Sequence, residues 1–260
     1  MVAELELADE VHFSPSQAGF QIRCEGADIA QRDNLAWRAA QALHDLPDAQ
    51  IVIQKQIPTQ AGLGGGSADA AATLLGLALI CADNGIVIPR TRLAQAALQT
   101  GSDVPAFLAS GLRVVAGVGD VVVQRACQAP LWGILLLRPN VGSPTANAYA
   151  LLDTAGVPHD LSPQATASAD AMCAAFAASD FGRFIALLHN DFTSVIESAL
   201  PPVAAARERL QAAGAQATIL CGSGSCVAGF FEDRATAHEA LARLSPAAGE
   251  WATATGFTSD

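Results

Sequence analysis

Hydrophobic positions alternate with polar ones near the N-terminus and then change to the spacing of a helix. The alternation predicts short strands, at residues 2–7, 11–13, 20–23 and 51–54. Apolar residues recur at helical intervals over residues 35–43, and Asp33 or Asn34 precedes them as a candidate N-cap. Ile57-Pro58 ends the fourth strand, because the residue before a proline is conformationally restricted.

A long apolar helix is predicted after a glycine-rich stretch. It begins near Ser67, carries apolar side chains at helical spacing and ends at Asn84-Gly85. A second helix over residues 91–98 follows, and a short one is expected after Asp103. The pattern then returns to alternation and predicts a hairpin, with strands at residues 112–116 and 121–124.

The character of the chain changes around residues 126–131, where we place a domain boundary. The predicted domains are residues 1–128 and residues 129–260. The second domain is mainly helical up to Gly214, and its residues 154–170, rich in Ala, Ser, Pro and Thr, predict a mobile loop. Its remaining elements are predicted as strands at 132–137, 217–220, 226–231 and 251–255 and a helix at 233–244.

Composition narrows the class of protein. The 260 residues are 51% hydrophobic, which is enough for substantial cores, and no run of 18 uninterrupted apolar residues predicts a membrane span. The net charge is −11 and Lys55 is the only lysine, so no basic stripe favours a nucleic-acid partner. The six cysteines include no CxxC pair, which predicts reduced thiols and no metal site. The N-terminus lacks signal-peptide character, so we expect a cytoplasmic protein.

Residues 58–71 carry the strongest chemical signal in the chain. Four glycines fall within five positions, between a predicted strand and a predicted helix. Glycine lets a ligand approach the backbone, and a helix N-terminus offers unpaired amides and a partial positive charge of roughly half a unit. This combination predicts a phosphate site, although a tight turn without a ligand would use glycine too. The loop has neither the Gly-Lys-Ser/Thr ending of a Walker A motif nor a G-x-G-x-x-G pattern.

Two charged residues beside this loop complicate the interpretation. Asp69 lies in the start of the predicted helix, where it suits the helix dipole but would repel a phosphate unless it points away or meets Mg²⁺. Lys55 ends the preceding strand, and we interpret it as a solvated strand end.

Two further motifs are candidates for function. In Gly101-Ser-Asp-Val-Pro105, Asp103 either caps a short helix or directs a carboxylate into a cleft, where it could accept a proton from an attacking hydroxyl. In Cys221-Gly-Ser-Gly-Ser-Cys226, small residues with free donors form either a second anion-binding turn or a simple connection between two strands.

Together, the three motifs resemble the GHMP kinase superfamily. The resemblance rests on residues 57–71, 101–108 and 222–226, with Asn34–Ala40, Asn190-Asp191 and, more loosely, 139–149 in support. It extends over essentially the whole chain. Within the superfamily, the Gly-Leu-Gly-Gly-Gly-Ser run and the Gly-x-Asp-Val-Pro motif are most similar to the kinases that phosphorylate the 2-hydroxyl of 4-diphosphocytidyl-2-C-methyl-D-erythritol in the non-mevalonate isoprenoid pathway.

The resemblance implies a fold, a reaction and a site. The fold is α+β, with a ribosomal protein S5 domain 2-like N-terminal domain and a ferredoxin-like C-terminal domain. ATP with Mg²⁺ would phosphorylate a cytidyl-diphospho sugar alcohol, Asp103 would be the catalytic base, and Gly222, Ser223 and Gly224 would line the cleft. The protein would be a monomer or homodimer with no nucleic-acid or membrane partner. The residues implied to wrap the ATP phosphates are Pro58, Thr59, Gln60, Ala61, Gly62, Leu63, Gly64, Gly65, Gly66, Ser67 and Ala68.

The sequence departs from the family pattern in three places. Cys221 stands where Ser or Thr is usual, and Gln60 replaces a common glycine. The family's first strand is not matched; it carries a lysine that partners the catalytic aspartate, and a Tyr-His pair that holds the cytidine base follows it. We therefore expect the upstream reading frame to encode that segment. Two alternatives stay open: another GHMP kinase, such as a homoserine or mevalonate kinase, and a nucleotide-binding protein impaired in catalysis.

Overall fold

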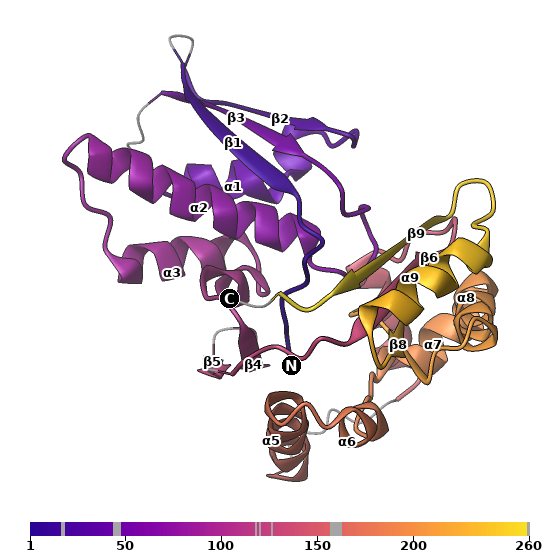
Figure 1. Ribbon diagram of the computed structural model, residues 1–260. Helices are drawn as coiled ribbons and strands as arrows, with labels where there is room; N and C mark the ends of the chain where they lie inside the picture. The colour runs from indigo at the N-terminus through magenta and orange to yellow at the C-terminus, as the bar shows by residue number, and fades with distance from the viewer. Residues whose placement is uncertain are drawn as a thin grey trace.

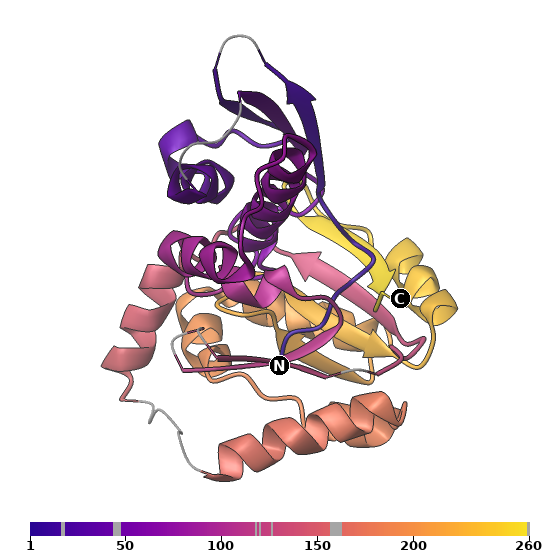
Figure 2. The same ribbon diagram turned by 90° about the vertical axis from the view of Figure 1, so that its left-hand side faces the viewer.

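The computed structural model describes residues 1–258 apart from 17–18, 44–47, 118, 120, 126 and 157–162 (Figure 1). Three sheets organise it: a three-stranded sheet and a hairpin from the first half of the chain, and a four-stranded sheet from the second half. In both views the two larger sheets lie in separate parts of the molecule, each with its own helices (Figures 1 and 2).

The N-terminal sheet has the order β1-β3-β2. Strand β1 (Glu10–Pro15) runs antiparallel to β3 (Ala49–Gln54), and β2 (Gln21–Glu25) runs parallel to β3. The connection from β2 to β3 contains the 3-10 turn η1 (Gln31–Asp33) and α1 (Leu35–Leu43). Of the two candidate N-caps, Asn34 is confirmed, because its Oδ1 accepts the Ala36 N–H at 2.8 Å.

Helix α2 (Gly65–Asp83) is the central helix of this half. Its buried residues share one core with α1 and with α3 (Arg90–Thr100), a core that includes Leu43, Ile51, Leu74 and Leu77. By length and composition alone α2 could cross a membrane, but core helices satisfy the same criteria and this one packs in the interior. The 3-10 helix η2 (Val104–Leu108) follows, and then the predicted hairpin is confirmed as β4 (Leu112–Ala116) and β5 (Val121–Arg125).

The C-terminal sheet is antiparallel throughout, with the order β7-β8-β6-β9. Its strands are β6 (Gly133–Arg138), β7 (Ala217–Leu220), β8 (Val227–Phe231) and β9 (Trp251–Gly256). Helix α8 (Pro201–Ala212) leads into β7, and α9 (Arg234–Leu244) joins β8 to β9. This strand order, with a helical connection before β7 and another after β8, confirms the predicted ferredoxin-like arrangement.

Between β6 and α8 lie four further helices: α4 (Thr145–Thr154), α5 (Pro163–Ala177), α6 (Phe181–Ala186) and α7 (Phe192–Ala199). The mobile loop predicted over 154–170 is wrong for residues 163–170, which belong to α5, while residues 157–162 lie outside the described part of the chain. Alanine favours a helix, and Pro163 occupies the first position, where its missing N–H costs nothing.

The strand predicted over residues 2–7 is also wrong. This segment makes only two isolated bridges, Val2 with Arg113 and Leu5 with Phe257. The alternation of apolar and polar residues nevertheless reflects which side chains are partly buried, since Ala3, Leu5 and Leu7 pack against a core that contains Trp132 and Phe184. That core also contains Ala61 and Leu112, so it joins the two halves of the chain.

Candidate active site

A cavity of about 670 Å³ lies between the two halves of the molecule. The N-terminal half contributes η1 and its flanks, the glycine-rich loop and Asp103, and the C-terminal half contributes small and aromatic residues. The lining residues are 28–30, 33–35, Lys55, 58–67, Asp69 and Asp103 on one side and Ser143, Thr145, Tyr149, Phe192 and 222–224 on the other.

The glycine-rich loop leads directly into the N-terminus of α2. The helix begins at Gly65, two residues before the predicted start, and Gly64 precedes it in the left-handed conformation with φ +72°. Gly65, Gly66 and Ser67 form the first turn and line the cavity. Because amides in a first helical turn have no partner within the helix, this arrangement can bind an anion. Ala68 does not line the cavity, and its N–H donates to the carbonyl of Gly64.

The loop lies directly against the second glycine-rich segment, residues 221–226. The N–H groups of Ser225 and Cys226 donate to the carbonyls of Gln60 and Ala61, at 3.3 and 3.1 Å. A Cβ added at Gly62 would lie 1.9 Å from the Cys221 carbonyl oxygen, so only glycine permits this approach. Two motifs that are about 160 residues apart in the chain therefore form one continuous backbone surface.

Hydroxyl and amide side chains hold the C-terminal wall of the cavity. The Ser143 hydroxyl donates to the Ser223 carbonyl at 2.6 Å, and the hydroxyls of Thr145 and Ser223 lie 3.2 Å apart. Asn190 donates from Nδ2 to the carbonyls of Leu220 and Gly222, at 2.7 and 2.8 Å. These bonds fix the residues around Gly222, Ser223 and Gly224, while the Ser223 hydroxyl stays available as a donor or acceptor at the cavity wall.

Asp103 lies at the start of η2 with its side chain exposed on the cavity. It occupies the N-cap position, yet its carboxylate makes no capping hydrogen bond there. The carboxylate accepts only a long hydrogen bond, from the Ser102 hydroxyl at 3.5 Å, and it lines the cavity, which favours the interpretation of Asp103 as a functional group over a purely structural cap.

A buried arginine supports the segment that carries Asp103. Arg113 has a fully buried side chain, and its Nη1 donates to the carbonyls of Ala106 and Ala109 and to Glu4. Its guanidinium lies 5.6 Å from the ring centre of Phe107, and a Cβ at Gly64 would approach that ring within 2.6 Å. The segment after Asp103 thus packs directly on the glycine-rich loop.

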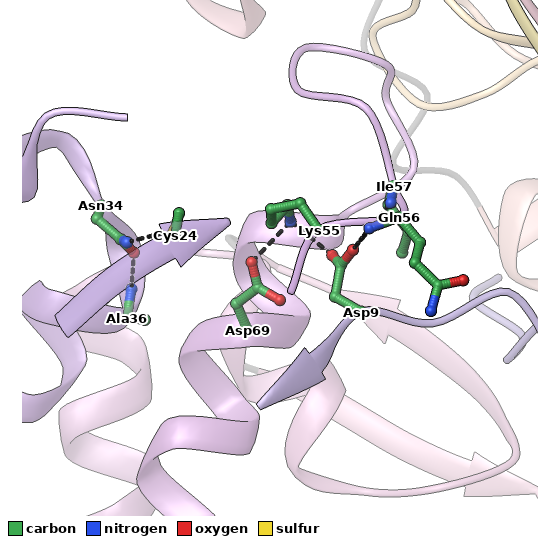
Figure 3. A network of polar contacts seen from close by, with 8 residues as sticks. All are labelled: Asp9, Cys24, Asn34, Ala36, Lys55, Gln56, Ile57 and Asp69. Carbon is green, nitrogen blue, oxygen red and sulfur yellow. Dashed lines mark hydrogen bonds and ion pairs between the residues drawn. The ribbon is translucent and has the colours of Figure 1, made fainter. Parts of the chain in front are cut away.

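Lys55 is buried between two carboxylates, so the expected solvated strand end is wrong (Figure 3). Its Nζ donates to Asp9 Oδ2 at 2.5 Å and to Asp69 Oδ2 at 2.7 Å. Burial acts to lower the pKa of Lys55, but the attraction of the carboxylates outweighs it and the pKa is raised. An ammonium can be buried here because two partners replace its water.

Asp69 is likewise held away from free solvent. Burial raises its pKa to about 6, against the opposing attraction of Lys55, and the nearby negative charge of Asp9 adds to the rise. The main cause is burial, which disfavours the charged form, and one ammonium cannot neutralise both carboxylates. The paired carboxylate is thus less able to repel a phosphate than the sequence suggested.

Aromatic side chains line part of the C-terminal side of the cavity. Tyr149, the only tyrosine of the chain, is 51% exposed and lines the cavity. Its ring meets that of Phe192 edge to face, with centroids 5.0 Å apart. An exposed aromatic face in a cavity can stack on a planar ring of a ligand. Helical spacing does not distinguish such residues from core aromatics, so sequence analysis did not single them out.

Among the residues that the structure describes, no group of three His, Cys, Asp or Glu side chains could hold a metal ion. All six cysteines are free thiols, as expected. Cys226 is fully buried and burial holds its pKa well above the usual value, so it is a poor metal ligand. An ion in the cavity would need ligands from its substrate as well as from the protein.

Family comparisons agree with the motifs. Residues 34–111 match the family model of the GHMP kinases N terminal domain, and residues 172–250 match that of the GHMP kinases C terminal domain. The chain is 33% identical to 4-diphosphocytidyl-2-C-methyl-D-erythritol kinase of Geobacter sp. strain M21, covering 98% of this chain and 88% of that protein. It is 36% identical to the kinase of the same name from Chlorobaculum tepidum, with 94% and 83% covered.

Solved structures show the same likeness. A crystal structure of 4-(cytidine 5'-diphospho)-2C-methyl-D-erythritol kinase superposes with a TM-score of 0.75 at 28% identity, covering 98% of this chain and 88% of that one. A homoserine kinase from Cytophaga hutchinsonii superposes with a TM-score of 0.68 at 16% identity, covering 98% and 87%, a likeness that concerns the fold alone.

Proposed function

The chain belongs to the GHMP kinases, and from that membership we propose that it transfers the γ-phosphoryl group of ATP to the 2-hydroxyl of 4-diphosphocytidyl-2-C-methyl-D-erythritol. One observation carries the proposal. A single cavity is lined by the glycine loop and the N-terminus of α2, by the Asp103 carboxylate, which makes no capping hydrogen bond, and by the exposed ring of Tyr149. Relatives that share at least 33% identity over most of their length carry the name of this kinase.

The glycine loop is suited to the phosphates of ATP. Its backbone approaches closely at Gly62 and Gly64, both at positive φ, and the first turn of α2 presents its amides to the cavity. In phosphoryl transfer the charge spreads over the γ-phosphate oxygens, so fixed donors aimed at them lower the barrier. We assign the binding of the phosphates to residues 58–67, with Ala68 completing the turn.

Asp103 is the proposed catalytic base. In this mechanism its carboxylate accepts the proton of the 2-hydroxyl, and the hydroxyl oxygen forms a bond to the γ-phosphorus. The bond between that phosphorus and the bridging oxygen breaks, and ADP departs with the electron pair. A carboxylate that spends no lone pair on capping is free for this role.

Mg²⁺ fits this site as an ion shared with the nucleotide. The described residues offer no complete set of protein ligands, but Mg²⁺ commonly uses one or two carboxylates together with substrate phosphates and water. Besides Asp103, the exposed carboxylates of Asp28 and Asp33 line the cavity. The ion would neutralise charge on the transferring phosphoryl group.

The aromatic wall supports a substrate that carries a nucleobase. The exposed ring of Tyr149 offers a stacking face, and its packing on Phe192 restricts its orientation. Base stacking on an aromatic side chain contributes about 1–3 kcal/mol per base. Homoserine and mevalonate have no ring to use this wall, so it favours the cytidyl substrate over those of other GHMP kinases.

The test compares three alcohols with one enzyme preparation. The protein is incubated with ATP, Mg²⁺ and the cytidyl substrate, homoserine or mevalonate, and ADP release and the phosphorylated product are measured. We expect turnover with the cytidyl substrate and product that carries phosphate at the 2-oxygen. Turnover with another alcohol alone would overturn the substrate assignment, and ATP binding without turnover of any of them would favour a nucleotide-binding role.

A further inference from the structure

We propose that Asp9, Lys55 and Asp69 form a positioning clamp that holds both ends of the phosphate loop and aims its amides before ATP binds. The inference rests on the proposed function, because it names ATP as the ligand of the loop. The three residues do not touch the reacting atoms in this proposal. They act through the loop.

The clamp joins the two stems of the loop. Lys55 directly follows β3 and precedes the loop, while Asp69 lies on α2, which follows the loop. The Lys55 ammonium binds Asp69 at 2.7 Å, so one contact connects the segment entering the loop to the helix leaving it. Asp9 comes from the segment before β1 and binds the same ammonium at 2.5 Å (Figure 3).

Asp9 also holds the backbone immediately before the loop. Its second oxygen, Oδ1, accepts the N–H groups of Gln56 and Ile57, at 2.6 and 2.8 Å. Pro58 is the next residue, so the clamp ends where the loop begins. A single carboxylate thus fixes the entering backbone with one oxygen and the ammonium with the other.

The start of α2 is seated on the same residues. A Cβ added at Gly65 would lie 3.0 Å from an Ile57 side-chain carbon and 3.3 Å from Asp9 Oδ2. Gly65 is the first residue of the helix, whose opening amides face the cavity. The position of these amides is therefore set by the helix's contact with the clamp.

Burial indicates that the clamp serves geometry more than stability. The side chains of Asp9, Lys55 and Asp69 are only 3%, 4% and 6% exposed. Taking charges out of water costs about as much as their attraction returns, so buried ion clusters add little net stability. What such a cluster does provide is one well-defined arrangement, since any displaced member would leave a buried charge unpaired.

The experiment measures loop order without ligand and then compares two ligands. Lys55→Met removes the charge at similar length, and Arg207→Met is the control, because it removes a bidentate pair with Glu197 (2.6 and 2.9 Å) that has no contact with the loop. Amide hydrogen exchange of residues 59–64 is followed in the free proteins. The affinities for ATP and for adenosine are then measured, with KM values for ATP and the alcohol.

We expect Lys55→Met to speed exchange in the loop and to weaken ATP binding by about tenfold or more, while adenosine binding changes by less than about twofold. KM for ATP should rise and KM for the alcohol should not. Arg207→Met should leave all of these unchanged. Asp69→Asn keeps an oxygen acceptor for Lys55, so it should change loop exchange, ATP affinity and KM for ATP in the same direction by smaller amounts. This variant replaces Lys55→Met in the test if Lys55→Met does not fold.

Two results would overturn the clamp. Unchanged loop exchange in Lys55→Met would show that the loop is ordered without it. Equal losses of ATP and adenosine affinity would show that Lys55 contacts the nucleoside itself. A wild-type protein that binds no ATP would instead refute the proposed function, and the exchange experiment would still test the clamp alone.

Discussion

Gly62 offers the sharpest test of the contact between the two glycine-rich segments. Its φ is +74°, and a Cβ would lie 1.9 Å from the Cys221 carbonyl oxygen and 2.8 Å from the Gly224 nitrogen. Gly62→Ala therefore adds both backbone strain and a clash with backbone atoms. Gly85→Ala is a matched control, because Gly85 has φ +77° and no atom within 4 Å of its Cβ position.

The structure sets the size of the expected effect. Both variants lose about 1–2 kcal/mol of unfolding free energy from the positive φ. In Gly62→Ala the loop and the Cys221 carbonyl must also separate until the 1.9 Å contact exceeds 3.0 Å, so the loop shifts by about 1 Å. Since a displacement of about 1 Å at a reacting centre costs about 10²-fold in rate, we expect kcat/KM to fall by about that factor.

Two measurements separate strain from displacement. Denaturant unfolding gives the stability of each variant, and steady-state kinetics with ATP and the cytidyl substrate give kcat and KM. We expect Gly85→Ala to keep the wild-type kcat/KM within about twofold. A loss of about 1–2 kcal/mol still leaves nearly all molecules folded, and their active site is unchanged. If Gly62→Ala matched Gly85→Ala in both measurements, the loop would not be held by this contact and the account of the junction would be refuted.

Four further substitutions test the site. Asp103→Asn should lower kcat by about 10²–10⁴ while ATP affinity, measured by titration, stays the same; retained kcat would exclude Asp103 as the base. Tyr149→Ala should raise KM for the cytidyl substrate by about 5–150-fold through lost stacking, with KM for ATP as the internal control. Arg113→Met should lower the unfolding free energy by about 1–3 kcal/mol, because it leaves the buried carbonyl of Ala106 and the part-buried carbonyl of Ala109 without their donor, and circular-dichroism melts would show it. Asp69→Asn should flatten the pH dependence of stability. The folded pKa of about 6 exceeds the ordinary aspartate pKa of 3.8, so wild-type stability declines by at most about 3 kcal/mol as pH rises through that window, and a parallel decline in the variant would contradict the assignment.

Local sequence signals predicted most of the elements because they depend on neighbouring residues. The Asn34 cap, the hairpin at residues 112–125 and the stop of a helix at Gly214 follow from rules that act within a few positions. Two predicted elements were wrong, the first for lack of tertiary information and the second because a loop-like composition was given more weight than local helix signals. Residues 2–7 alternate like a strand but lack a neighbouring strand to pair with along their length, and residues 163–170 look like a loop by composition but lie in α5.

Charged residues show the same limit more clearly. A single lysine at a strand end reads as solvated, since nothing near it in sequence neutralises it. Its partners Asp9 and Asp69 lie 46 and 14 residues away, and only folding brings all three together. Tyr149 is similar, because its exposure in a cavity depends on walls contributed by other elements.

The chain by itself determined the chemistry: the glycine loop before a helix, the Gly-x-Asp-Val-Pro motif and the second glycine turn each specify a local backbone that suits a phosphate or a proton transfer. Tertiary structure decided how those pieces become one site. It placed Gly62 against Cys221 and buried Lys55 between two carboxylates. It also placed Asp103 at the cavity, where its side chain makes no capping hydrogen bond. Local conformation depends on short-range sterics and hydrogen bonds that a sequence displays directly. Burial, ion pairing and close backbone approach depend on residues that are distant in the chain, and they exist only once the fold has brought those residues together.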